Sequence, residues 1–269
     1  MEARSNGTGG GSLDSEPANC EGQAFGREAR LIWISGPPRA GTTMLNFAIA
    51  GDRYLPECTI ITEFVRLYSV CVNDTDRRFK AFFGERAAAK EKFSAILKTA
   101  LSGTPDDAVL KDPNLCLYLN EWRELFPNDR AVIIIRDPRD VVSSMLQVLR
   151  KTNPGAKVRQ AIDAVAPHFF EIDRADLQTD KILTVRYEDI VSSKRGTINV
   201  LSGFLGRPLS TMHQSSYKFD QSDPFFSNLY GKPVVSERIG CYKTQLTQVE
   251  LREVVNVYSG IISRYFPDL

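Results

Sequence analysis

Residues 35–43 read SGPPRAGTT and directly follow a short apolar run, a pattern typical of a phosphate-binding loop between a strand and a helix. Gly36 and Gly41 would let backbone N–H groups approach an anion, and the helix start would add the positive end of its dipole. Thr42 occupies the position that holds lysine in loops that bind nucleoside triphosphates. Arg39 is the cation of this loop, and its guanidinium could fork onto oxygens beyond the bound phosphate. A chance turn is the alternative.

A second motif that could bind an anion, AVIIIRDPRDVVSSM, spans residues 131–145. Its apolar run ends in Arg136, where a nucleoside triphosphatase would carry an aspartate that helps to hold Mg²⁺. Ser144 lies eight residues later, on a helix that Asp137 is expected to cap. The guanidinium and the hydroxyl would form a second anion site, separate from the first. The alternative is a surface Arg136 paired with Asp140.

Together the two motifs resemble those of sulfotransferases that use 3′-phosphoadenosine 5′-phosphosulfate (PAPS). The resemblance covers about residues 31–266 and is strongest in 31–50 and 108–146. It implies transfer of a sulfuryl group to an acceptor hydroxyl, without a metal ion. PAPS has no γ-phosphate for the absent lysine to hold, and its separate 3′-phosphate would explain the second motif. The donor-binding residues implied in the two motifs are Arg39, Ala40, Gly41, Thr42, Thr43, Arg136 and Ser144.

The segment VLKDPNLCLYLNEWRELFPN, residues 109–128, is most similar to the tyrosylprotein branch of this family, in which a strand ends in Lys-Asp-Pro. By that resemblance Lys111 is a catalytic cation that meets the oxygen bridging phosphorus and sulfur. Negative charge builds on this oxygen as the S–O bond breaks, so a cation there would stabilise the transition state. In the alternative, Lys111 pairs with Asp112 at the protein surface.

The segment ECTIITEF, residues 57–64, lies where the tyrosylprotein branch has a Gly-Glu-Glu-Thr segment that supplies the base. The resemblance implies that Glu63 deprotonates the acceptor, with Glu57 as a substitute and a solvated carboxylate as the alternative. Histidine is the base in the cytosolic small-molecule branch. His168 and His213 lie outside these motifs, which favours Glu63.

Two later segments also resemble the family. ILTVRYEDIV, residues 182–191, implies that Tyr187 lies near the adenosine, although an edge tyrosine with a wet hydroxyl would fit as well. Lys232-Pro-Val is similar to a segment whose lysine contacts the donor. Residues 238–243 resemble a Gly-Arg-Trp-Lys region, so both Lys232 and Lys243 are candidates to complete the 3′-phosphate site.

Short apolar runs alternate with longer helical patterns, which predicts an α/β fold with a parallel sheet of about five strands flanked by helices. We expect a single P-loop-type domain at 30–269 after a disordered tail at 1–29. Ligands of such sheets bind beyond the carboxyl ends of the strands, where the motifs fall. The expected strands are 31–35, 58–61, 108–110, 131–135 and 182–185. The expected helices are 42–50, 64–72, 76–101, 115–125, 138–150, 158–177, 194–205 and 247–265, and the long irregular stretch 206–246 is expected to be functional.

Composition narrows the classes of partner. A net charge of +1 gives no broad field for nucleic acid or an anionic membrane. No apolar stretch is long enough to span a bilayer, and the first 29 residues lack the apolar region of a secretory signal. The five cysteines are odd in number and show no CxxC spacing, which favours reduced thiols in the cytoplasm over disulfides or a metal site.

Two other functions remain open from the sequence: a P-loop kinase with a displaced cation, and a non-catalytic domain that binds PAPS or its product 3′,5′-bisphosphoadenosine (PAP). The missing lysine and Arg136 argue against the kinase. The acceptor is equally open between a tyrosyl peptide, a sugar and a small molecule. The sequence does not indicate an oligomeric state.

Overall fold

Four parallel strands form a sheet in the order β2-β1-β3-β4. Every residue of β1 and β2, and all but one of β3, is buried, which explains their nearly continuous apolar runs. The strands are β1 Ile32–Ser35, β2 Val109–Lys111, β3 Arg130–Ile135 and β4 Ile182–Arg186. The computed structural model describes residues 31–53, 55–73, 77–175, 177, 179–206, 220–223, 225–226 and 236–268.

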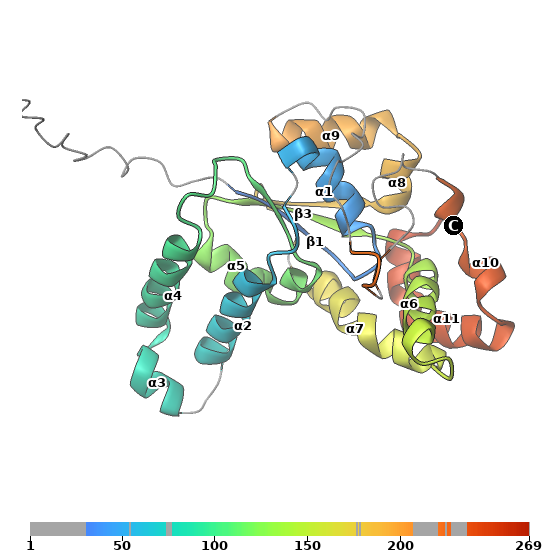
Figure 1. Ribbon diagram of the computed structural model, residues 1–269, viewed down its shortest axis with the longest axis horizontal. Coiled ribbons are helices and arrows are strands. Elements are labelled where there is room, and N and C mark those ends of the chain that lie inside the picture. Colours follow the sequence, from blue (N-terminus) through green and yellow to red (C-terminus); the bar gives the residue numbers. More distant parts are fainter. Residues whose placement is uncertain are drawn as a thin grey trace, which may run out of the picture.

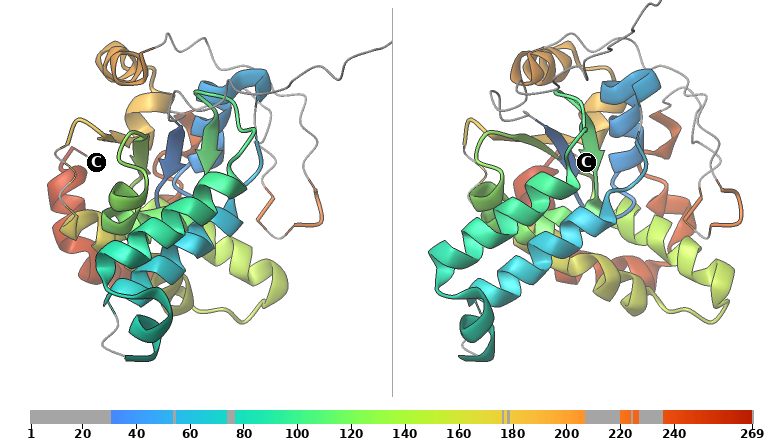
Figure 2. Two further views of the ribbon diagram at one scale, coloured as in Figure 1. Left: turned by 90° about the vertical axis from the view of Figure 1, so that its left-hand side faces the viewer. Right: turned by 60° about the vertical axis from the view of Figure 1, so that its left-hand side comes forward.

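Helices cover both faces of the sheet (Figure 1), with α1, α8 and α9 on one face and α2, α5 and α7 on the other. Helices α2 and α4 lie side by side at one end of the molecule (Figure 2). Within the described ranges, no helix has both the length and the apolar character needed to cross a bilayer. The helices are α1 Thr42–Ala50, α2 Thr59–Asn73, α3 Arg77–Phe83, α4 Arg86–Ala100, α5 Leu119–Leu125, α6 Pro138–Thr152, α7 Val158–Arg174, α8 Tyr187–Val191, α9 Arg195–Leu205, α10 Tyr242–Gln245 and α11 Gln248–Tyr265, with short 3-10 helices η1 Gly51–Arg53, η2 Pro113–Tyr118 and η3 Ser236–Arg238.

Alternate residues of β1 enter two different cores, as the two-residue period of a strand requires. Ile32 and Ile34 pack with α1 and α9, whereas Trp33 packs with α2, α4 and α5. The indole Nε1 of Trp33 donates to Oδ2 of the buried Asp129 at 2.8 Å. This pairing satisfies the one polar atom of a fully buried side chain and fixes β1 within the sheet.

The fold class is confirmed, and four of the predicted strands lie within one residue of their expected bounds. The fifth strand, predicted at 58–61, is wrong. Glu57 forms an isolated parallel bridge to Lys111, and α2 already begins at Thr59. The apolar residues there follow the helical period, because Ile61 and Val65 both face the core from α2.

The single helix predicted at 76–101 is also wrong, because it is divided into α3 and α4 around Gly84. This glycine has a φ of 80°, in the left-handed region that interrupts a helix. Helix α4 then packs its buried face against α2.

Helix α7 supports the corner that follows β2. The Nε2 atom of the buried His168 lies 3.0 Å from Oδ1 of Asn114, in η2. Asp112 caps the same corner, since its carboxylate accepts from the N–H of Asn114 at 2.8 Å. The chain direction just after Lys111 is therefore fixed by contacts on both sides of the turn.

We expect His168 to make folding sensitive to acid. Burial lowers its pKa to about 4, below the ordinary value of roughly 6.5, so the unfolded chain binds the proton first as pH falls. The free energy of unfolding should then drop between pH 6.5 and 4, by up to about 3 kcal/mol from this group. Urea denaturation of the wild type and His168→Gln at pH 7.5 and 4.5 measures this share. Equal pH dependence in the two proteins would contradict it.

Candidate active site

The loop between β1 and α1 lies directly on β3. At Gly36, with a φ of 146°, an added Cβ would lie 2.1 Å from the carbonyl oxygen of Ile134. Arg39 has a φ of 73°, a left-handed conformation that costs a non-glycine residue about 1–2 kcal/mol. The turn is closed by the N–H of Ala40, which donates to the carbonyl of Pro37 at 3.0 Å. The loop is thus held in one tight path.

Helix α1 starts at this loop without a side-chain cap. Its N-cap residue is Gly41, with a φ of 103°, and within the described part of the chain the helix start has no side-chain cap. Thr42 and Thr43 follow and are both buried. Uncapped N–H groups and the positive dipole end make this helix start suited to an anion.

Lys111, the last residue of β2, brings a buried ammonium to the same place. The register pairs Ile34 of β1 with Lys111, so both strands end together. The Nζ atom of Lys111 donates to Oγ1 of Thr43 at 3.2 Å and forms an ion pair with the carboxylate of Glu57. The Lys111 side chain is 3% exposed and that of Glu57 is 49% exposed. A buried cation therefore lies behind a carboxylate that solvent can reach.

Glu63 lies on α2, whereas Glu57 lies on the segment before this helix. The Glu63 side chain is half exposed and accepts from Nε of Arg66 at 2.7 Å. Among the two glutamates considered as the base, it is Glu57 that contacts Lys111. His168 packs under the sheet as described above, and His213 lies outside the described residues.

Arg136 is buried at the end of β3 and lies beside the loop. One Nη donates to the carbonyl of Arg39 at 3.5 Å, and the other donates to the carbonyl of Arg238. An ion pair of 3.4 Å joins it to Asp140. Its Nε is buried and has no hydrogen-bond partner within the described ranges. The predicted pairing with Asp140 exists, but the guanidinium is inside the protein and keeps one donor unused.

Ser144, on α6, contacts the cation of the loop. Its Oγ accepts from Nε of Arg39 at 3.1 Å, and an Nη of Arg39 donates to the carbonyl of Phe225 at 2.7 Å. The structure therefore joins the two predicted anion motifs through a direct side-chain contact. Arg39 is turned towards the second motif here.

Tyr187 links the loop to Arg136. It is the first residue of α8, and a Cβ on Gly41 would lie 2.7 Å from its ring. The guanidinium carbon of Arg136 lies 4.5 Å from the ring centroid. Burial raises the pKa of the Tyr187 hydroxyl. Of the other donor-binding candidates, Lys232 lies outside the described residues, and Lys243 is exposed on α10.

Asp140 was not expected to organise the site. Its carboxylate, fully buried, accepts from the N–H groups of Gly240 at 2.8 Å and of Tyr242 at 3.0 Å. It thereby ties the chain after η3 to the start of α6. The four-residue spacing between Arg136 and Asp140 signalled their pairing in the sequence. Nothing local signalled the backbone partners of Asp140, because they lie about a hundred residues further along the chain.

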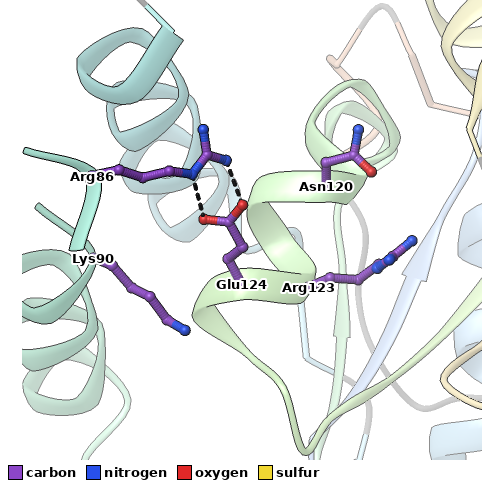
Figure 3. Close-up of a pocket in the computed structure, with 5 residues that line it drawn as sticks. All are labelled: Arg86, Lys90, Asn120, Arg123 and Glu124. Atoms are coloured by element: carbon purple, nitrogen blue, oxygen red, sulfur yellow. Dashed lines mark hydrogen bonds and ion pairs between the residues drawn. The ribbon is translucent and has the colours of Figure 1, made fainter.

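A cavity of about 550 Å³ lies away from these residues, between α4 and α5 (Figure 3). Arg86 and Lys90 of α4 face Glu124 of α5, whereas Arg123 extends away from them. Burial raises the pKa of Glu124, but hydrogen bonds from Arg86 and Tyr68 outweigh this and hold it below its usual range. The lining residues are Arg86, Lys90, Asn120, Arg123 and Glu124.

A family model described as "Sulfotransferase family" matches residues 32–211. The sulfotransferase domain from the curacin biosynthetic pathway superposes with a TM-score of 0.54 at 17% identity, over 87% of this chain and 99% of that chain. The sulfotransferase domain of the Synechococcus PCC 7002 olefin synthase gives 0.54 at 17%, over 86% and 94%. Retinol dehydratase in complex with androsterone and inactive cofactor PAP gives 0.50 at 14%, over 90% and 83%. At these identities the structural likeness concerns the fold.

We expect Gly36→Ala to lower the free energy of unfolding by about 2–4 kcal/mol, because the added Cβ meets a backbone oxygen that cannot move aside. Gly103→Ala is the matched control. Gly103 also has a positive φ, 83°, but nothing lies within 4 Å of its added Cβ, so only about 1 kcal/mol should be lost. Denaturant titration measures both. Equal losses would contradict the close approach of the loop to β3.

Proposed function

The chain belongs to the sulfotransferase family and is an enzyme that transfers a sulfuryl group to an acceptor hydroxyl; we propose that its donor is PAPS, bound by the two anion motifs. One observation supports this proposal: the uncapped helix start at Gly41 and the buried guanidinium of Arg136 both lie against the Tyr187 ring. Retinol dehydratase, a protein of similar fold, was solved with PAP.

The residues present fit the two ends of this nucleotide. The first-turn N–H groups of α1, with Thr42 and Thr43, would hold the 5′-phosphosulfate, because they lack a capping acceptor. Arg136 and Ser144 would hold the 3′-phosphate. The unused Nε of Arg136 supports this role, since a buried donor without a partner costs about 1–3 kcal/mol unless a ligand satisfies it.

We infer that Glu57 takes the proton of the acceptor hydroxyl. Its carboxylate is half exposed, so an acceptor can reach it from solvent while Lys111 lies behind. The acceptor oxygen attacks sulfur, the bond between sulfur and the bridging oxygen breaks, and the proton passes to Glu57. Lys111 stabilises the charge on the departing phosphate oxygen from a site with little water, where a fixed cation acts most strongly.

Arg39 is proposed to hold sulfuryl oxygens, as its place in the loop first suggested. In the structure its guanidinium donates to Ser144 and to the Phe225 carbonyl. We propose that it exchanges the Phe225 carbonyl for the donor. The guanidinium offers five donors, so it can keep one contact while it makes another.

Several predictions from the sequence stay proposals. These are the cytoplasmic location, the likeness to the tyrosylprotein branch, the single domain at 30–269, Lys232 as a donor contact, and the absence of nucleic-acid and membrane partners. Glu63 as the base is kept as the alternative to Glu57. The kinase alternative predicts use of ATP–Mg²⁺, and the non-catalytic alternative predicts PAP binding without turnover.

A thermal shift assay tests the donor. PAP at ~100 times its Kd should stabilise the protein by about 2.7 kcal/mol, and ATP–Mg²⁺ should stabilise it far less. Arg136→Ala should reduce the PAP shift, because it removes the charge facing the 3′-phosphate. Arg150→Ala on α6, which breaks a surface pair with Glu250 and a contact with the carbonyl of Ala156, should leave the shift unchanged. A larger shift with ATP–Mg²⁺ would favour the kinase.

Two glutamine variants identify the base. Glu57→Gln should lower kcat by about 10²- to 10⁴-fold with little change in PAP affinity, because the amide cannot accept the proton. Glu63→Gln should stay within about twofold of the wild type, since it removes only an exposed pair with Arg66. Initial rates with radiolabelled PAPS measure both. The reverse order of effects would assign the base to Glu63.

A further inference from the structure

Glu188 lies beside the turn that carries Arg136, the residue proposed to hold the 3′-phosphate. The pairing of β3 with β4 ends at Ile135 and Arg186, so the residues that follow them leave the sheet side by side. There the N–H of Asp137 donates to Oε1 of Glu188 at 3.0 Å. The carboxylate thereby holds the peptide group that joins Arg136 to Asp137.

We propose that Glu188 is a positioning residue: by holding this peptide group it aims the Arg136 guanidinium at the 3′-phosphate, and so makes the site select nucleotides that carry this group. The inference rests on the proposed function, because it takes PAPS as the donor and Arg136 as its 3′-phosphate contact. Glu188 acts through the backbone and through Arg136, since its carboxylate is buried.

The N–H of Asp137 needs an acceptor from outside its own helix and strand. Asp137 is the N-cap residue of α6, and the N–H of an N-cap residue makes no bond within its helix. The strand ladder cannot supply an acceptor either, because β4 gives way to α8 at Tyr187. A buried N–H without an acceptor is costly. The side chain of Glu188, 4% exposed, supplies the acceptor where the ladder ends.

The Arg136 side chain depends on this fixed starting point. Its bond to the Arg39 carbonyl is 3.5 Å long, and its ion pair with Asp140 measures 3.4 Å, so neither contact is tight. The third partner, the carbonyl of Arg238, belongs to η3 and holds the far end of the side chain. A shift of the peptide group before α6 would therefore move the guanidinium. Its donors form a rigid fork, so such a shift would spoil their fit to a phosphate.

The charge of Glu188 acts in the opposite direction. Burial raises the pKa of its carboxyl group, and the nearby Arg136 guanidinium is one of the groups that oppose this rise. A carboxylate close to Arg136 also cancels part of the positive charge that an incoming phosphate would meet. Loss of the charge alone should strengthen phosphate binding, whereas loss of the hydrogen bond should weaken it. Substitution can separate the two effects.

The test compares the Kd of PAP with that of adenosine 5′-monophosphate (AMP), which lacks the 3′-phosphate, by isothermal titration calorimetry. Glu188→Met and Glu188→Asp should weaken PAP binding by about tenfold, the loss expected when one hydrogen bond to a charged group is poorly made. Methionine has no acceptor oxygen, and aspartate is one methylene shorter. Glu188→Gln keeps an acceptor oxygen and should bind PAP at least as tightly as the wild type. The Kd of AMP should stay unchanged in all three variants.

Asp189→Asn is the matched control, because Asp189 is the next residue of α8 and its carboxylate pairs with Lys194 near the surface. It should leave both Kd values unchanged. The ratio of the two Kd values is the decisive readout, since a general loss of structure would weaken PAP and AMP alike. The aspartate variant keeps the charge and decides the question if the methionine variant does not fold.

Three results would overturn the positioning role. They are an unchanged PAP affinity in the aspartate and methionine variants, equal losses for PAP and AMP, and a loss in the glutamine variant as large as that in the aspartate variant. Each of these leaves the donor assignment standing, provided that the wild type prefers PAP to AMP. Equal affinity of the wild type for the two nucleotides would instead reject the proposed 3′-phosphate site itself.

Discussion

A positive charge held inside the protein is the constraint on which the site depends. The Lys111 ammonium is almost wholly buried, and an unpaired buried ammonium would cost several kcal/mol. Its two partners, Thr43 and Glu57, come from the first turn of α1 and from the segment before α2. Three chain segments must therefore meet at one point. The parallel register of β1 and β2 brings them there, because it places the end of β1 beside Lys111.

Short-range patterns predicted most of the elements, and they failed where one pattern fitted two structures. The run from Cys58 to Ile61 is short and apolar, so it suits a buried strand as well as the start of an amphipathic helix. Only contacts with the core, made by Val65 and Tyr68 further along α2, decide for the helix. The division of the long helix was different, because Gly84 was visible in the sequence as a helix breaker.

The site was predictable to the extent that its contacts are local. The loop, the end of β3 and the end of β2 each form one continuous motif in the sequence. The parallel topology then gathers the three motifs at the carboxyl ends of the strands. The partners of Arg136 were not predictable, because they are backbone carbonyls whose identity leaves no mark on the sequence. The choice between Glu57 and Glu63 likewise depends on where β2 ends, which is a tertiary fact.

The left-handed backbone of Arg39 has a consequence for variation at this position. Glycine would adopt that φ without strain, yet it would remove the guanidinium that bonds Ser144. Isoleucine or valine would keep bulk but would suffer most from the conformation. Position 39 can therefore relax the backbone or keep the contact with Ser144, and this chain carries the residue that keeps the contact. We expect substitutions that relieve the strained backbone at position 39 to stabilise the protein and to lower its activity.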